Sequence, residues 1–350
     1  VTTIQKLYNA ITREHHLKTM DDLKDKKIVF IFDECHRSQF GDTHKKITQY
    51  FENYQMFGFT GTPIFVENAL SKNKQNQTTA SLFGKCLHKY VITDAIRDEN
   101  VLKFSVEYIQ TFKQKEQIID LKVEQINETE VFEAPERKEA IVDYIILHHD
   151  QKTQSRKFCA MMCVQDIDAV IQYYEIFKRK KQNGEHNLKL ATIFSFGAND
   201  SMITDTEDYD EKDFNEVAEP KESYNSYHKR DKLEEYIIAY NLTYGTNWTT
   251  KDSQSFYNYY KDIAQRVRTK QVDILFVVNM FLTGFDSKSL NTLFVDKNLK
   301  YHGLIQAYSR TNRILGDKKS QGNIVVFRNL KKAKIGRAHV WTPVTISDLV

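Results

Sequence analysis

The stretch IVFIFDECHRSQFGD, Ile28 to Asp42, begins as a short apolar run and ends in acidic, amide and imidazole side chains. An apolar run of this length followed by polar residues is typical of a buried strand. A helical face of apolar and aromatic residues comes next, at Ile47, Tyr50, Phe51 and Tyr54. A further strand-like run, MFGFT, extends from Met56 to Thr60. Strand, helix and strand in this order predict a βαβ unit and a parallel sheet.

The same alternation resumes in the second half of the chain. Apolar runs typical of strands cover Phe158–Val164, Leu188–Phe194, Val272–Val278, Leu290–Asp296 and Asn323–Phe327. Helical periodicity covers Lys138–His148, a segment with Ile167, Val170, Tyr174 and Phe177, two segments ahead of Val272, and Leu304–Arg313. We therefore expect a second α/β domain, again with a mainly parallel sheet.

The chain has 350 residues, which is enough for two compact domains of ordinary size. We predict a first domain over residues 1–112, a charged connection over residues 113–136, and a second domain over residues 137–334. An acid-rich stretch near residues 201–226 has no clear period and predicts a polar surface insertion. Residues 335–350 are left out of the fold prediction, because the stretch IGRAHVWTPVT matches the translation of a common sequencing adapter.

Composition limits the classes of function. With 50 Lys and Arg against 47 Asp and Glu, the formal charge of +3 is small, so any nucleic-acid site has to be local. The sequence has no run of about 18 apolar residues, which a membrane-spanning helix needs, and its abrupt start at Val1 predicts a missing upstream part. The cysteines show no paired C-x-x-C spacing, and three of the four lie in or beside apolar runs, which favours small buried thiols over disulfides or zinc ligands and suits a reducing cytoplasm. They are Cys35, Cys86, Cys159 and Cys163.

The adjacent carboxylates Asp33 and Glu34 follow the first predicted strand directly. Ligands of parallel sheets bind at the carboxyl ends of the strands, so both acids are expected at a ligand-binding edge. One carboxylate can hold a phosphate-bound Mg²⁺ through water while the other orients and deprotonates an attacking water. The alternative is that the pair caps the next helix, although its start near Thr43 is distant for that task. Taken alone, the acid pair leaves both interpretations open.

Three further motifs follow the acid pair in order: GFTGTP at Gly58 to Pro63, TGFD at Thr283 to Asp286, and QAYSRTNR at Gln306 to Arg313. In a helix, Gln306, Arg310 and Arg313 would share one face. Two planar cations on one face suit a triphosphate, where they offset the charge that grows during phosphoryl transfer. The alternative is a solvated face, or salt bridges between the arginines and nearby acids.

Together these motifs resemble those of superfamily 2 helicases and translocases, with DECH similar to motif II, TGTP to motif III, FLTGFD to motif V and QAYSRTNR to motif VI. More narrowly, the sequence resembles the restriction (motor) subunit of type I restriction-modification enzymes. VTTIQKL, DECHRSQFGD, FGFTGTPIF and the long block VVNMFLTGFDSKSLNTLFVDKNLKYHGLIQAYSRTNRIL carry this likeness, which extends from Val1 to about Leu330. The resemblance implies an α/β fold of two RecA-like domains with mainly parallel sheets, the first one incomplete.

The resemblance also implies roles for individual residues. Asp33 would be the partner of Mg²⁺, through water, and Glu34 the base that activates water. Residues expected at the nucleotide from the second domain are Gly284, Asp286, Gln306, Arg310 and Arg313. Residues expected to link the nucleotide to DNA contacts are His36, Thr60 and Thr62. Residues expected to contact DNA are Thr2, Thr3 and Thr283. Ser309 stands where many superfamily 2 proteins have glycine.

No G-x-x-x-x-G-K-[ST] phosphate loop occurs in the sequence. We expect it, and the nuclease domain of such subunits, upstream of Val1. The resemblance implies an ATP-dependent translocase of duplex DNA that uses ATP and Mg²⁺ beside modification and specificity subunits, with this fragment inactive alone. Two alternatives remain: another superfamily 2 enzyme, such as a type III restriction subunit or a remodeller, and a nonenzymatic DNA-binding or assembly fragment.

Overall fold

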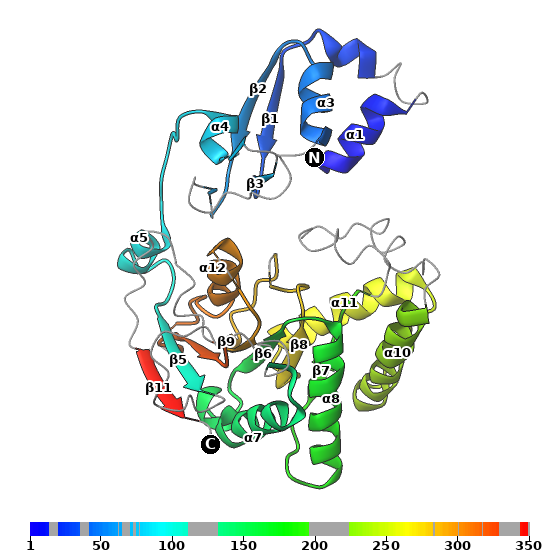
Figure 1. Ribbon diagram of the computed structural model, residues 1–350, viewed down its shortest axis with the longest axis vertical. Helices are drawn as coiled ribbons and strands as arrows, with labels where there is room; N and C mark the ends of the chain where they lie inside the picture. The colour runs from blue at the N-terminus through cyan, green and yellow to red at the C-terminus, as the bar shows by residue number, and fades with distance from the viewer. Residues whose placement is uncertain are drawn as a thin grey trace, which may run out of the picture. The chain divides into compact units, whose positions relative to one another are not determined.

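The fold is described from a computed structural model, in which the chain divides into two compact units, Val1–Val91 and Ile92–Val350 (Figure 1). We call them unit 1 and unit 2 and describe each by itself. The structure describes residues 1–13, 20–35, 42–61, 63–64, 71–72, 75–76, 78–110, 132–195, 224–282, 284–299, 301–316, 318–328 and 344–348.

Unit 1 is built on a parallel pair of strands. Its helices are α1 (Ile4–Thr12), α3 (Asp42–Tyr50) and α4 (Thr79–Phe83), and its strands are β1 (Ile28–Phe32), β2 (Tyr54–Gly58), β3 (Ser71–Lys72) and β4 (Gln75–Asn76). Strand β1 pairs with β2 along its whole length, with Phe32 opposite Gly58, whereas β3 and β4 form a short antiparallel pair. This arrangement confirms the predicted parallel βαβ unit, although Tyr54, which we predicted on the helical face, begins β2.

The core of unit 1 is small and lies on one face of β1. Its buried members are Ile11, Ile47 and Phe51, and α1, α3 and β1 supply apolar side chains around them. On the other face of the strand, Val29 is 49% exposed and Ile31 is 71% exposed. Within the described residues, β1 therefore has one packed face and one open face.

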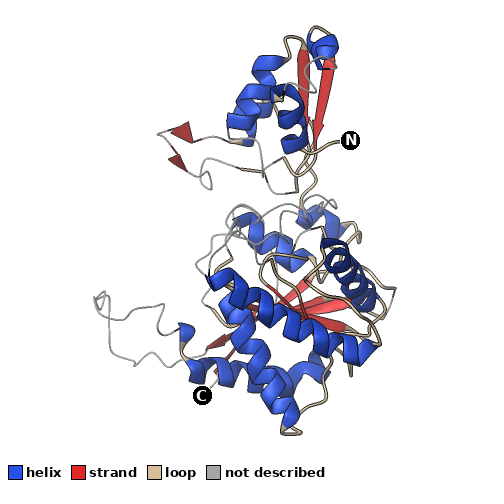
Figure 2. Ribbon diagram, turned by 90° about the vertical axis from the view of Figure 1, so that its right-hand side faces the viewer, coloured by secondary structure: helices blue, strands red, loops and turns tan. Residues whose placement is uncertain are grey.

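Unit 2 contains a seven-stranded parallel sheet. Its strands are β5 (Phe104–Gln110), β6 (Cys159–Val164), β7 (Leu190–Thr192), β8 (Ile274–Val277), β9 (Leu290–Asp296), β10 (Gly322–Val326) and β11 (Val344–Asp348), in the order β11-β5-β10-β9-β6-β8-β7. Its helices are α5 (Ile92–Arg97), α7 (Pro135–Lys152), α8 (Ile167–Gln182), α10 (Tyr224–Tyr244), α11 (Ser253–Arg268) and α12 (Tyr301–Ser309). Figure 2 shows helices packed around these strands.

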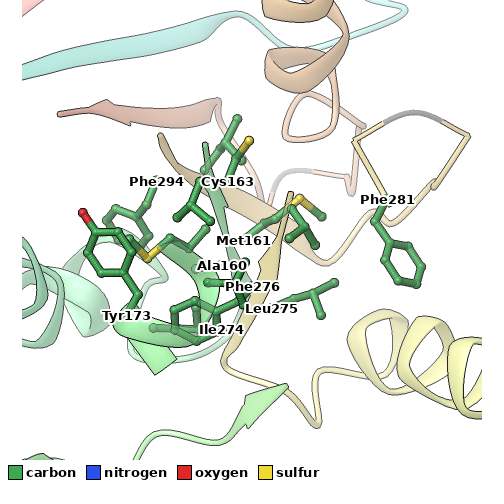
Figure 3. Packing of buried hydrophobic residues seen from close by; sticks show 14 of the residues in the cluster. Ala160, Met161, Cys163, Tyr173, Ile274, Leu275, Phe276, Phe281 and Phe294 are labelled. Carbon is green, nitrogen blue, oxygen red and sulfur yellow. The ribbon is translucent and has the colours of Figure 1, made fainter. Parts of the chain in front are cut away.

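The central strands of unit 2 are buried on both faces. Every residue of β6, β8 and β9 is buried, as expected for parallel strands that helices cover on both sides. Figure 3 shows Met161 of β6, Phe276 of β8, Phe294 of β9 and Tyr173 of α8 as members of this core. The strands predicted from Phe158, Leu188, Val272, Leu290 and Asn323 are all present, one or two residues shorter at several ends.

A buried ionic group closes the carboxyl end of β9. Asp296 is 1% exposed and accepts two hydrogen bonds from the Arg137 guanidinium, at 2.6 and 3.1 Å. Arg328 Nε donates to Asp296 Oδ1 at 3.0 Å, and the Tyr173 hydroxyl donates to Oδ2 at 2.6 Å. Burial alone would raise the pKa of Asp296, but Arg137 and Arg328 lower it overall. The start of α7 and the residues after β10 are thereby tied to one strand.

The boundary between the units differs from the predicted one. We predicted a first domain through residue 112, but β5 pairs with β10 in the sheet of unit 2, and the boundary follows Val91. The segment FSVEYIQ forms this strand because its buried residues, such as Phe104 and Val106, complete the core of unit 2.

Parts of three other predicted segments lie outside the described residues. The predicted connection is described only from residue 132, and the polar insertion only from residue 224. In the C-terminal segment left out of the fold prediction, β11 pairs with β5. Among the described residues, none of the helices combines the length and hydropathy that crossing a membrane would require.

Candidate functional site

The acid pair lies in a tight turn at the carboxyl end of β1, where the sequence predicted it. The strand ends at Phe32, and residues 33–35 form the turn. The Cys35 N–H donates to the Phe59 carbonyl at 3.0 Å, and the Phe59 N–H donates to the Phe32 carbonyl at 2.8 Å. Both ends of the turn are thus tied to the chain that continues β2.

The backbone of Glu34 adopts an uncommon conformation. Its φ is +44°, and its N–H donates to Asp33 Oδ1 at 2.9 Å. A positive φ is unusual outside glycine and is found where the surroundings hold it in place, often at functional sites. Asp33 is exposed and Glu34 half-buried, so the turn presents two carboxylates of different environment side by side.

A close approach to the turn explains why residue 58, the first of GFTGTP, is glycine. A Cβ on Gly58 would lie 2.8 Å from Cys35 Sγ and 2.9 Å from the Phe83 ring. Cys35 is 1% exposed, and burial raises the pKa of its thiol to about 11, with the negative charge of Glu34 adding to the shift. The thiol beneath the acids is therefore a packing group that stays protonated.

The alternative that the acid pair caps the next helix falls partly on residues 36–41, which lie outside the described part of the chain. The recorded bond of Asp33 goes to the neighbouring Glu34 N–H, and α3 begins at Asp42. Residues between the turn and the helix, including the predicted His36, lie outside the described part, as do Thr62 and Thr283. Thr60 is described and half-buried.

The two threonines expected at DNA lie at the start of α1. The Thr3 hydroxyl accepts from the Lys6 N–H at 3.2 Å and caps the helix. The Thr2 hydroxyl is exposed and donates to the Thr3 carbonyl at 3.4 Å. Thr3 thus has a structural task, and contact with DNA stays a prediction for both residues.

The candidate catalytic arginines lie in unit 2 and contact one dipeptide, Phe285–Asp286. Arg310 Nη1 donates to the Phe285 carbonyl at 2.6 Å, and Arg310 Nε donates to the Gln306 carbonyl at 3.2 Å. Arg313 Nε lies 3.0 Å from Asp286 Oδ1. The predicted alternative of a salt bridge with a nearby acid therefore describes Arg313 as it stands here. Gly284, just before this dipeptide, is exposed and has φ +66°.

The prediction of one shared helical face was wrong. Helix α12 ends at Ser309, so Gln306 lies in the helix while Arg310 and Arg313 follow it. The Arg310 N–H donates to the Ala307 carbonyl three residues back, which tightens the last turn. The hydroxyls of Ser309 and Thr311 donate to preceding carbonyls and compete with the helix. Arg310 and Arg313 are brought together because both bind the Phe285–Asp286 dipeptide, and not because they share a helical face.

Two cations beside this dipeptide were missed from the sequence. Arg268 Nε donates to the Asp286 carbonyl at 3.1 Å, and Lys319, 2% exposed, donates to the Leu290 carbonyl at 2.7 Å. Burial lowers the pKa of Lys319 to about 7, with the Asp286 charge raising it and the Arg313 charge lowering it. Both residues stand in ordinary basic stretches, RVRTK and GDKKS, so no pattern indicated these contacts.

The chemistry of the donor set bears on the expected metal. Among the described residues, no three His, Cys, Asp or Glu side chains group as a metal site. Magnesium at nucleotide sites keeps several waters and is held by one or two carboxylates plus phosphates. The Asp33–Glu34 pair fits that smaller donor set and does not fit a metal held by protein ligands alone.

Two family models match successive parts of the chain. The model of the type I restriction enzyme subunit R domain 3 matches residues 156–329. The model of the SWI2/SNF2 ATPase matches residues 1–138.

Curated relatives match along nearly the whole chain. The type I restriction enzyme SauMSSORF170P endonuclease subunit of Staphylococcus aureus (strain MSSA476) is 46% identical over 353 aligned residues, covering 100% of this chain and 36% of the relative. The SsaAORF53P endonuclease subunit of Staphylococcus saprophyticus is 48% identical over 335 residues, covering 95% of this chain and 34% of the relative. The chain thus spans about a third of the length of these relatives.

A solved structure shares the fold. It is a fragment proposed to come from an HsdR subunit of a type I restriction enzyme of Vibrio vulnificus YJ016, with a TM-score of 0.55 and 13% identity, covering 95% of this chain and 50% of that one. The predicted fold class, two RecA-like α/β domains with mainly parallel sheets, is confirmed. The relatives and the match to the subunit R model show that the chain belongs to the family of type I restriction enzyme endonuclease (R) subunits.

Proposed function

We propose that this chain is the motor part of a type I restriction endonuclease subunit, which hydrolyses ATP to move duplex DNA before cleavage. The observation that carries the proposal is the turn after β1, where Asp33 and Glu34 stand side by side at the ligand-binding end of a parallel strand. The match to type I endonuclease subunits over the whole chain supports the same reading.

In this proposal the two acids have separate tasks. Glu34 orients and deprotonates the attacking water, and Asp33 holds Mg²⁺ through water. When bound, Mg²⁺ supplies positive charge to the phosphates of ATP. The unequal exposure of the two carboxylates supports different roles, since the half-buried Glu34 is the better shielded from bulk water.

Unit 2 supplies the cations. Gln306, Arg310 and Arg313 act on the γ-phosphate, and Gly284 and Asp286 border the nucleotide. The Phe285–Asp286 dipeptide supports this assignment because it binds the guanidiniums of both Arg310 and Arg313 and so keeps them close together. Thr2, Thr3 and Thr283 contact DNA, and His36, Thr60 and Thr62 couple these contacts to the nucleotide.

The proposal includes partner molecules and a cellular location. Duplex DNA is the track, and modification and specificity subunits complete the complex in the cytoplasm. Several relatives carry the words endonuclease subunit in their names, which supports an assembly with further subunits. We further propose that the fragment alone is inactive, since no phosphate loop occurs in this sequence.

The experiment measures DNA-stimulated ATP hydrolysis by the full-length subunit carrying Glu34→Gln or Asp33→Ala. We expect Glu34→Gln to keep ATP binding and lose turnover by roughly 10² to 10⁴. Asp33→Ala should lose turnover and also require more Mg²⁺. Glu52→Gln is the matched control, because Glu52 is an exposed acid just before β2 and so lies at the opposite end of the β1–β2 pair. Normal turnover by the Glu34→Gln protein would overturn the assignment.

A further inference from the structure

Helix α11 contacts the loop between β8 and β9 at two places. This loop carries the Phe285–Asp286 dipeptide. The Tyr260 ring stacks on the Phe281 ring at 4.6 Å between centroids and 14° between planes, and Figure 3 shows Phe281 on this loop. The Ser289 hydroxyl donates to the Val267 carbonyl at 2.6 Å. The helix thus holds the loop near its beginning and near its end.

The loop contains a conformation that needs such support. Phe281 has φ +66° and is 3% exposed. A positive φ is a genuine outlier for a bulky side chain, so it persists only where the surrounding packing holds it in place. The Tyr260 stack and an edge contact from Phe285, 4.7 Å between centroids, supply that packing.

Arg268, the last residue of α11, joins the helix to the dipeptide itself. Its Nε donates to the Asp286 carbonyl at 3.1 Å, and its guanidinium lies over the Phe285 ring at 5.3 Å. Three guanidiniums therefore converge on two residues: Arg310 on the Phe285 carbonyl, Arg313 on the Asp286 carboxylate, and Arg268 on the Asp286 carbonyl. Only the first two belong to a recognisable motif.

We propose that Arg268 is a positioning residue for phosphoryl transfer. It holds the Phe285–Asp286 dipeptide in the position in which Arg310 and Arg313 bind to it. The inference rests on the proposed function. Transition-state stabilisation depends on fixed placement, and displacement of a supporting group by about 1 Å can lower turnover by about 10²-fold. Arg268 acts through the other two arginines and has no contact with ATP in this proposal.

The same helix provides a matched control. Arg266, two residues earlier, donates to Asp262 Oδ2 at 2.8 Å and to Gln271 Oε1 at 2.6 Å, and its guanidinium lies over the Tyr244 ring. It is an arginine of the same helix end with hydrogen bonds of its own, and its recorded contacts avoid the Phe285–Asp286 dipeptide. Its removal tests what loss of any arginine from α11 does to folding and charge.

The test compares Arg268→Ala, Arg268→Lys and Arg266→Ala in the full-length subunit at saturating duplex DNA. We expect Arg268→Ala to lower kcat for ATP about tenfold or more with KM changed by less than about threefold, as for an interaction made in the transition state. Arg268→Lys, which keeps a charge over the Phe285 ring, should recover part of the loss. Arg266→Ala should leave kcat near that of the unmodified subunit.

Two further measurements separate positioning from other roles. In an Arg313→Lys background, Arg268→Ala should lower kcat much less than in the unmodified subunit, because coupled residues are not additive. Hydrogen exchange without nucleotide should quicken in residues 284–290 of the Arg268→Ala protein and not in Arg266→Ala.

Each contrary result has a distinct meaning. An Arg268→Ala effect that is confined to DNA affinity and persists in the Arg313→Lys background would mean that Arg268 binds DNA, and would overturn the inference. Equal kcat for Arg268→Ala and Arg266→Ala would overturn it too. Absence of DNA-stimulated hydrolysis in the unmodified subunit would instead refute the proposed function.

Discussion

The acid turn of unit 1 and the arginine-bearing loop of unit 2 are built in opposite ways. Asp33 and Glu34 follow the carboxyl end of β1, beside a small cluster of three buried residues. The Asp286 region instead lies beside the amino end of β9, where Lys319 binds the Leu290 carbonyl, against the large core of the seven-stranded sheet. The acid turn depends on strand position, and the arginine-bearing loop depends on packing.

This difference predicts how substitutions in each of the two regions should act. The acids need only a strand end and a tight turn, so substitutions there should act on chemistry first. The arginines need a loop that is held by α11, by Lys319 and by their own hydrogen bonds. Substitutions around them should therefore change stability and turnover together. The following predictions test this contrast, from the largest expected effect to the smallest.

The largest effect is expected for Arg313→Lys, which keeps the charge but loses the planar guanidinium. In the full-length subunit, ATP should still bind while hydrolysis falls by about 10³ to 10⁵, the range found for finger arginines. Loss of the exposed Asp286 pair alone would change stability by less than about 1 kcal/mol. Rates of ATP hydrolysis and of DNA movement distinguish a finger arginine from a surface salt bridge. An Arg313→Lys subunit that hydrolyses ATP normally would refute the assignment.

Asp296→Asn should destabilise unit 2 by about 3–5 kcal/mol, because the buried Arg137 would lose its counter-charge and Arg328 would keep only its longer contact with Glu133. Urea unfolding of the chain measures the change. The control is Asp143→Asn, whose side chain is 59% exposed and pairs with Lys180, and whose loss should cost less than about 1 kcal/mol. Similar losses for both variants would show that the buried cluster does not stabilise the fold.

Gly58→Ala should destabilise unit 1 by about 1–3 kcal/mol, since the added Cβ would overlap Cys35 Sγ and the Phe83 ring. The shift should also reach the acid turn and slow ATP hydrolysis. Gly61→Ala is the control, because a Cβ there meets nothing within 4 Å. Denaturation and ATPase rates of both variants test whether the turn depends on this one close approach.

Lys319→Met should change how stability depends on pH. The folded pKa of Lys319 is lowered to about 7 from its ordinary 10.5, so between these values the unfolded chain binds more protons than the folded one. The free energy of unfolding therefore gains up to about 1.4 kcal/mol per pH unit as pH rises through this window, and the gain is lost as pH falls towards 7.

The methionine variant lacks this titration. Between pH 7 and 9, the free energy of unfolding of the unmodified chain should thus rise relative to that of Lys319→Met. Lys318→Met, at an exposed neighbouring lysine, should leave the pH dependence as it was. A difference that stays constant over this range would mean that Lys319 is charged in the fold.

The order of strands and helices was readable from the sequence because parallel strands buried on both faces are continuous apolar runs. CAMMCV in β6 and LNTLFVD in β9 are examples. The place of Asp33 and Glu34 followed from the same rule, since a strand end in a parallel sheet is a ligand edge. The strand FSVEYIQ was missed, because it alternates apolar and polar residues instead of forming a continuous apolar run, and its partner β10 lies far along the chain.

The sequence by itself thus determined the α/β class, the strand that carries the acids and the motifs that identify the family, because all of these are local patterns. Only the tertiary structure decided the end of α12 before Arg310, the strained backbone of Phe281, and the convergence of Arg268, Arg310 and Arg313 on one dipeptide. The end of α12 comes from local hydrogen bonds of Ser309, Arg310 and Thr311 that compete with the helix. The Phe281 backbone and the convergence of the arginines arise from contacts between residues distant in sequence, which no local pattern encodes.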